Sequence, residues 1–138
     1  MLSTEEKNKL LDQYGMRHYH RIRDENVVTV SFRKNVNVKD VIGIIRISKK
    51  RSEQKGPLES LFFGENEWEE NKPKVSTHWH IAFLNPVAHK LKVEMTRSFE
   101  YFASHASMAD KKIVCRWHCN GAVDYLTVGH SLPFYKRF

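Results

Sequence analysis

The chain has 138 residues, a formal net charge of +7 at pH 7 and two cysteines. That is the length of one domain that can form a core unaided. Two cysteines exclude a disulfide framework, and the apolar runs fall far short of the roughly 18 residues of a membrane span. Because no signal-like apolar segment stands at the N-terminus, we expect a reducing intracellular setting, and the basic balance favours a polyanionic partner, most simply nucleic acid.

Residues 1–26 predict a short helix followed by a basic segment. Ser3 and Glu6 form a capping box, and Gly15 ends the helix. His18-Tyr19-His20 is a His-x-His pair, but a metal cation bound there would meet like charge. The neighbouring arginines are Arg17, Arg21 and Arg23. We therefore interpret this segment as facing phosphate rather than holding a metal.

Alternating apolar residues predict a strand from Val27 to Phe32. Asn37 can then cap a helix whose apolar residues recur at helical spacing, although the β-branched residues from Ile42 to Ile47 also allow a strand. We predict the helix. Its cationic end is Lys49-Lys50-Arg51, and Gly56-Pro57 breaks the chain after it.

A second His-x-His pair lies in a predicted strand over residues 77–83. Large apolar residues occupy its odd positions, namely Trp79, Ile81 and Phe83. His78 and His80 must then share the opposite face, roughly 6.6 Å apart, so that both imidazoles can reach one divalent metal ion. The alternative is that the two histidines are simply polar groups on a solvated face.

Two glutamates precede this pair. A strand predicted from Leu61 to about Trp68 places Glu65 and Glu67 on one face, and the short connection to the histidine strand favours antiparallel pairing. If Glu67 faces His78, then Glu65 faces His80. A mixed set of carboxylates and imidazoles favours Mg²⁺ or Mn²⁺ over structural zinc.

Asn85-Pro86 predicts the start of the next helix, with Asn85 as the cap. Its expected buried stripe is Leu91, Met95, Phe99, Phe102 and Ala106. A strand follows over residues 113–119. Cys115, His118 and Cys119 could form a zinc corner, but alternation places His118 on the face opposite the cysteines, so core packing of the cysteines is the preferred interpretation.

Asn120-Gly121 turns the chain into a helix predicted from Ala122 to Val128, which carries Tyr125. Gly129 ends this helix. Tyr135 lies beyond Pro133 and cannot share the helical face of Tyr125, so we expect it to be a packing aromatic. Strands and helices in this order indicate an α+β domain.

This order, from about Val27 to His130, resembles the HUH endonuclease family. That family comprises rolling-circle replication initiators of plasmids and small circular-DNA viruses, with relaxases and single-strand transposases as relatives. Three stretches carry the resemblance: Val28–Phe32 is similar to the first-strand motif, Phe63-Gly64-Glu65 with His78-Trp79-His80 to the metal motif, and Asp124–Thr127 to the nucleophile motif. The resemblance implies a ferredoxin-like HUH fold with a central antiparallel sheet and the catalytic tyrosine on the last helix.

It also implies roles for single residues. Glu65, His78 and His80 become ligands of Mn²⁺ or Mg²⁺, with Glu67 as a possible substitute, and Tyr125 becomes the nucleophile. The implied function is a site-specific single-stranded DNA endonuclease and strand transferase that initiates rolling-circle replication through a 5′-phosphotyrosine intermediate. Expected DNA contacts are Arg17, Arg21, Arg23, Lys49, Lys50, Arg51, Lys136 and Arg137.

In this scheme the chain is a single domain. Residues 1–26 form its N-terminal helix and basic segment, 27–130 the HUH core, and 131–138 a C-terminal tail. Many family members carry a lysine three residues after the tyrosine, where this chain has Val128, and His130 or another basic residue is an open substitute. The alternatives are a non-cleaving DNA-binding module of the same fold, a transposase, and a domain stabilised by zinc. The implied partners are single-stranded DNA of an origin hairpin or loop, and either a second copy of the chain or a host replication helicase. The implied location is a bacterial or archaeal cytoplasm or, for a eukaryotic virus, the host nucleus.

Overall fold

The structure, a computed structural model, describes residues 3, 5, 16–64, 75–105, 114–122, 126 and 134–138. Its 3-10 helices and α-helices are η1 (Met16–Arg21), η2 (Asp24–Asn26), α2 (Val38–Ser52) and α3 (His89–His105). Its strands are β1 (Val27–Asn37), β2 (Glu59–Gly64), β3 (Val75–Phe83), β4 (Cys115–Trp117) and β5 (Phe134–Arg137). The predicted leading helix and the predicted helix of Tyr125 fall almost wholly outside these residues.

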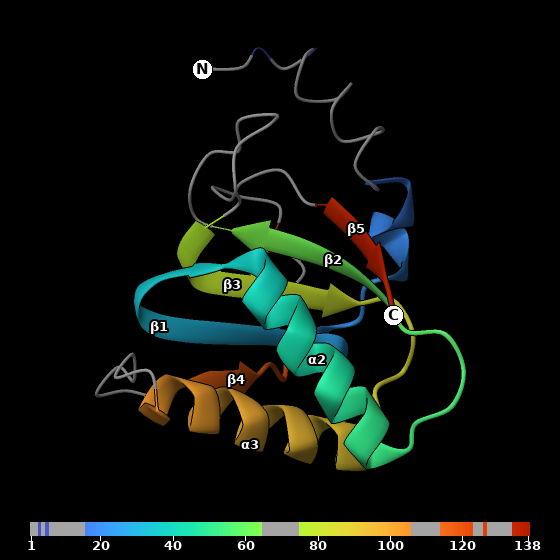
Figure 1. Cartoon of the computed structure of the whole chain (residues 1–138). Coiled ribbons are helices and arrows are strands. Elements are labelled where there is room, and N and C mark those ends of the chain that lie inside the picture. The colour runs from blue at the N-terminus through green and yellow to red at the C-terminus, as the bar shows by residue number, and fades with distance from the viewer. Residues whose placement is uncertain are drawn as a thin grey trace.

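The five strands form one antiparallel sheet in the order β4-β1-β3-β2-β5. Figure 1 shows α2 and α3 lying across the same face of this sheet. The α+β prediction is therefore confirmed, and the arrangement is compatible with a generic ferredoxin-like fold. No helix in the described ranges is long and apolar enough to cross a bilayer.

The helix-covered face of the sheet holds the larger core. The strands contribute alternate residues to it, among them Val28, Val30, Phe32, Trp79, Ile81 and Phe83. Val41 and Ile45 of α2 and Leu91 and Met95 of α3 pack onto them. The Trp79 indole N–H donates to the carbonyl of Val36 at 3.0 Å, which satisfies the polar atom of a fully buried side chain. The odd positions of β3 thus face the core, as predicted.

The opposite face of the sheet, called here the histidine face, carries a smaller apolar cluster. Its buried members are Ile22, Val27, Leu61, Phe63, Ala82, Leu84, Ala122 and Leu126, with Tyr19 and Tyr135 packed against them. Leu61 and Phe63 come from alternate positions of β2, which confirms the predicted parity for the described part of that strand.

The helix predicted after Asn37 is present, so the strand alternative for this segment is wrong. The Asn37 side-chain oxygen accepts from the backbone N–H of Lys39 at 2.8 Å. The helix ends at Ser52, before the predicted break at Gly56-Pro57, because Glu53 adopts the left-handed conformation with φ of 57°.

The helix predicted at Asn85-Pro86 begins later, at His89. The Asn85 side chain instead accepts from the backbone N–H of Glu59 at 2.8 Å, so it ties the end of β3 to the start of β2 rather than capping α3. Of the predicted stripe, Leu91, Met95 and Phe99 are buried and Phe102 is partly buried, whereas Ala106 lies outside the described residues.

Candidate active site

The two histidines of β3 lie beside β2 in the predicted antiparallel pairing, but in a shifted register. Phe63 pairs with His80, and Gly64 pairs with Trp79. The expected partner of His80 was Glu65, two residues further on, so that register is wrong. Burial does not separate the two registers, because Leu61 faces a buried residue of the histidine face in either of them, Ala82 as observed or Leu84 in the expected pairing. Glu65 and Glu67 lie outside the described residues.

His80 is held in the protein by a neighbouring strand. It is 2% exposed, and its Nδ1 lies 2.9 Å from Oγ1 of Thr29, the residue that pairs with it on β1. The same Thr29 oxygen lies 2.7 Å from Nε2 of His118. One hydroxyl therefore joins two imidazole rings. A hydroxyl has only one proton, so it can donate a hydrogen bond to one ring at most. It therefore accepts a hydrogen bond from the other ring, or from both rings.

The pKa of His118 favours its neutral form, which in one of its two tautomers gives the following chain of hydrogen bonds. Burial, foremost, and the charge of Arg116 lower the pKa of His118, while Asp24 opposes the shift. A neutral His118 can accept the Thr29 proton at Nε2. Thr29 then accepts from Nδ1–H of His80, which leaves Nε2 as the metal-ligating nitrogen of His80 if a metal is bound.

His118 is a site residue that the sequence reasoning missed. It was considered only as a companion of the two cysteines and then set aside. The available signal was the same alternation that separated His118 from the cysteines, because the face opposite buried Cys115 is the histidine face. The backbone N–H of His118 donates to the carbonyl of Val27 at 3.0 Å, which fixes this residue against β1.

His78 lies two residues before His80 and is half-buried. Its Nδ1 lies 2.9 Å from Oγ1 of Thr77, so both histidines make a contact between Nδ1 and a threonine hydroxyl. Its backbone is held by Ser76, whose hydroxyl donates to the carbonyl of His78 at 2.7 Å. The placement of both histidines on the face opposite Trp79 is as predicted.

Two imidazoles supply at most two of the ligands that a divalent ion needs. Within the described ranges, no group of three His, Cys, Asp or Glu side chains could hold a metal ion. The zinc corner has no support there: Cys115 is buried in the larger core, Cys119 is exposed, and Nε2 of His118 contacts Thr29. Core packing of the cysteines is confirmed for Cys115 and wrong for Cys119, which is exposed.

Tyr125 lies outside the described residues, but two residues close to it in the sequence do not. Ala122 and Leu126 are 1% and 4% exposed, and both belong to the apolar cluster of the histidine face. The chain matches no protein-family model, no curated protein and no solved structure. Its function is therefore inferred from the geometry of these residues and the resemblance of its motifs.

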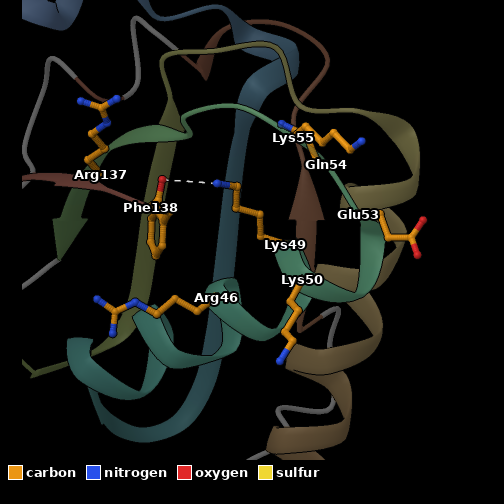
Figure 2. A pocket seen from close by; sticks show the side chains of 8 residues that line it. All are labelled: Arg46, Lys49, Lys50, Glu53, Gln54, Lys55, Arg137 and Phe138. Carbon is orange, nitrogen blue, oxygen red and sulfur yellow. Dashed lines mark hydrogen bonds between the residues drawn. The ribbon is translucent and has the colours of Figure 1, made fainter.

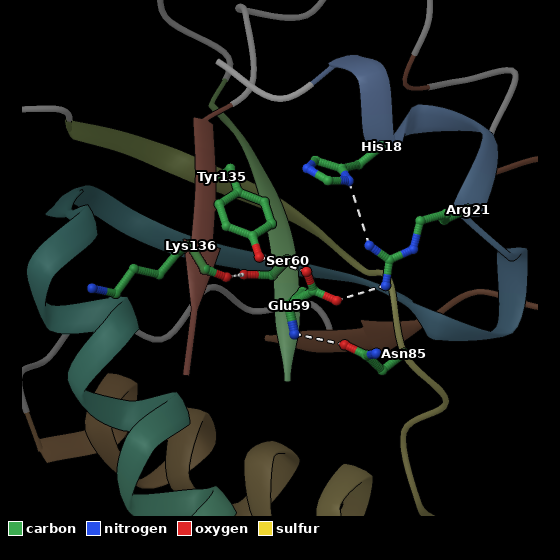
Figure 3. A network of polar contacts seen from close by, with 7 residues as sticks. All are labelled: His18, Arg21, Glu59, Ser60, Asn85, Tyr135 and Lys136. Atoms are coloured by element: carbon green, nitrogen blue, oxygen red, sulfur yellow. Dashed lines mark hydrogen bonds and ion pairs between the residues drawn. The ribbon is translucent and has the colours of Figure 1, made fainter. Parts of the chain in front are cut away.

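Tyr135, the other tyrosine near the C-terminus, belongs to a polar network shown in Figure 3. Its hydroxyl donates to Glu59 at 2.5 Å, Arg21 donates to the same carboxylate at 2.6 Å, and His18 stacks on the Tyr135 ring at 4.9 Å. Arg21, first, and Tyr135 lower the pKa of Glu59 to about 2. Burial, first, and the bond to Glu59 raise the pKa of Tyr135, which disfavours the phenolate that a nucleophile needs.

The basic residues expected to contact DNA fall into separate groups. Arg21 is paired with Glu59, and Arg23 donates to the carbonyls of His20 and Ile22, both at 3.1 Å. These two guanidinium groups are engaged within the protein. Lys49, Lys50 and Arg137 line one pocket. The other members of the expected set are Arg51, which is exposed, Lys136, which is half-buried, and Arg17, whose side chain is outside the described part of the chain.

Proposed function

We propose that this chain is a metal-dependent, site-specific single-stranded DNA endonuclease and strand transferase of the HUH type. The observation that carries the proposal is the geometry of His78 and His80 on one face of the sheet. His80 is buried there, and its Nδ1 contacts a threonine that also contacts His118. A metal-ligating imidazole characteristically donates its other ring N–H to a fixed acceptor, and Oγ1 of Thr29 lies where it can accept from His80.

The proposed ligands are His78, His80 and Glu65. Glu65 directly follows Gly64, and the strand partner of Gly64 is Trp79, the residue between the two histidines. Glu67, two residues further along the chain, is the alternative carboxylate. Imidazole nitrogens with carboxylate oxygen suit Mn²⁺ or Mg²⁺, and a metal ion at this site would neutralise the scissile phosphate and stabilise charge developing on it.

The proposed nucleophile is Tyr125. Ala122 and Leu126 are buried in the cluster on the histidine face, so the chain on both sides of Tyr125 is anchored on the side of the sheet that carries His80. Tyr135, by contrast, has its hydroxyl committed to Glu59 and its pKa raised. Glu59 itself is a poor base at a pKa of about 2.

The proposed reaction is a transesterification. The Tyr125 oxygen forms a bond to phosphorus as the bond from phosphorus to the 3′ oxygen breaks. The phenol loses its proton, and the departing 3′ oxygen gains one. One phosphodiester is exchanged for another, so the 3′-hydroxyl can later attack the phosphotyrosine and rejoin the strand. In this proposal the reaction nicks an origin hairpin or loop and so starts rolling-circle replication.

Covalent capture tests the proposal. The protein is incubated with a random single-stranded DNA pool and Mn²⁺, and any DNA that stays attached through a denaturing gel is sequenced. We expect an adduct with one recognised sequence that disappears in chelator. Failure of every sequence and metal to give an adduct contradicts the proposal.

One sequence feature favours a second candidate, a DNA-binding module of the same fold that does not cut. The position where many family members carry lysine holds Val128. Such a module would bind the selected DNA without forming the adduct, so the same experiment separates the two candidates.

A further inference from the structure

A basic pocket of about 500 Å³ lies between the C-terminal half of α2 and the end of β5. Five cationic side chains line it, namely Arg46, Lys49, Lys50, Lys55 and Arg137, with one acidic side chain, Glu53. Phe138 also lines it and packs against the core under the helices. The pocket therefore adjoins the helix-covered side of the sheet, whereas His80 faces the other side.

Two of the residues that line this pocket, Lys49 and Phe138, are held by contacts within the protein. Lys49 Nζ donates to the carbonyl of Phe138 at 3.3 Å, and the Phe138 ring lies 6.4 Å from the ring of Phe62 in the core. Figure 2 shows the other charged ends, those of Arg46, Lys50, Lys55 and Arg137, pointing in different directions around this centre. All four of these side chains are exposed, and none makes a salt bridge to another described residue.

The helix dipole does not account for this concentration of charge. Basic residues in the last turn of a helix are stabilising, which covers Lys49 and Lys50. Lys55 lies beyond the helix, Arg46 precedes its last turn, and Arg137 comes from β5. Cations from three separate places in the chain therefore line one pocket.

We propose that this pocket binds the phosphodiester backbone of a nucleic acid strand. Its charges are spread around the pocket instead of converging on one point, which suits successive phosphates of a chain better than a single small anion. Backbone contacts of this kind supply affinity without sequence preference. The inference deepens the proposed function, and it rests on that function only for the choice of nucleic acid as the polyanion.

Salt-dependent binding tests the assignment without cleavage. Binding of a fluorescent single-stranded oligonucleotide is measured by anisotropy, in chelator, over a range of salt concentrations. The pocket variant is Arg46→Gln with Lys50→Gln. The control, Lys39→Gln with Arg97→Gln, removes one exposed lysine of α2 and one exposed arginine of α3 that do not line the pocket.

We expect the pocket variant to flatten the slope of log affinity against log salt by about 1.4, since each phosphate contact to a single strand contributes about 0.7. At about 0.1 M salt this corresponds to a loss of affinity of roughly 25-fold. The control variant should change both values much less. Equal effects of the two variants, or an unchanged slope in the pocket variant, overturn the proposal.

Two further results separate a polynucleotide ligand from a small anion, and the pocket assignment from the nuclease proposal. Saturable binding of inorganic pyrophosphate, with oligonucleotide affinity unchanged in the pocket variant, overturns the assignment to a polynucleotide. Because the assay needs neither metal nor Tyr125, a protein that never forms an adduct but shows the expected loss refutes the nuclease and leaves the pocket assignment supported.

Discussion

Replacing Thr29 with valine removes the hydroxyl that joins His80 to His118 and leaves the side-chain volume almost unchanged. Both contacts are short, at 2.9 Å and 2.7 Å, and the His80 ring is buried. The change leaves a buried imidazole nitrogen without its partner, which costs about 1–3 kcal/mol of stability. It also releases the orientation of the ring that we propose as a metal ligand, so we expect Mn²⁺ affinity to fall about 10- to 100-fold.

The assay is calorimetric titration with Mn²⁺, with unfolding of the metal-free protein measured in parallel. Thr96→Val is the matched control, because Thr96 also makes hydrogen bonds, to the carbonyl of Lys92 and to Trp117, on the helix-covered side of the sheet. It should lower stability and leave Mn²⁺ affinity unchanged. Thr29→Ser keeps the hydroxyl and should recover most of the affinity. If Thr29→Val binds Mn²⁺ as tightly as the unchanged protein, Thr29 does not orient a ligand.

Three other predictions concern the proposed metal ligands and the ion pair of Glu59. His78→Ala and His80→Ala should each abolish cleavage, because each removes a proposed metal ligand, with the larger loss of stability at buried His80. Full cleavage by the double variant in chelator would exclude the assignment. Glu65→Ala should reduce activity more than Glu67→Ala, and the reverse ranking in a cleavage assay would make Glu67 the ligand. Glu59→Gln should cost about 1–2 kcal/mol near neutral pH. The pKa of Glu59 is about 2 in the folded protein against an ordinary 4.5, so this difference in unfolding free energy should shrink as pH falls from 4.5 towards 2, and a pH-independent difference would contradict the ion pair.

Patterns within one element predicted the structure best. The alternation of Trp79, Ile81 and Phe83 placed both histidines on the correct face, since a strand has no other way to bury three large side chains together. Asn37 marked the start of α2 because its side chain needs only a neighbouring backbone N–H, that of Lys39.

Contacts between elements were predicted less well. The register of β2 against β3 was wrong because parity alone cannot distinguish pairings two residues apart, and both pairings keep Leu61 opposite a buried residue, Ala82 or Leu84. Asn85 was expected to cap the next helix, yet its side chain accepts a hydrogen bond from the backbone N–H of Glu59, which is far away in the sequence. His118 was missed for the same reason, since its link to His80 depends on the pairing of β1 with both β3 and β4.

The most direct test of the nuclease is to map the residue to which DNA becomes attached. The adduct is digested with protease and nuclease, and the modified peptide is identified by mass spectrometry. The proposed chemistry predicts a 5′-phosphate on Tyr125, an adduct that is lost in Tyr125→Phe and retained in Tyr135→Phe. DNA attached to Tyr135, or an adduct that persists in Tyr125→Phe, would contradict it.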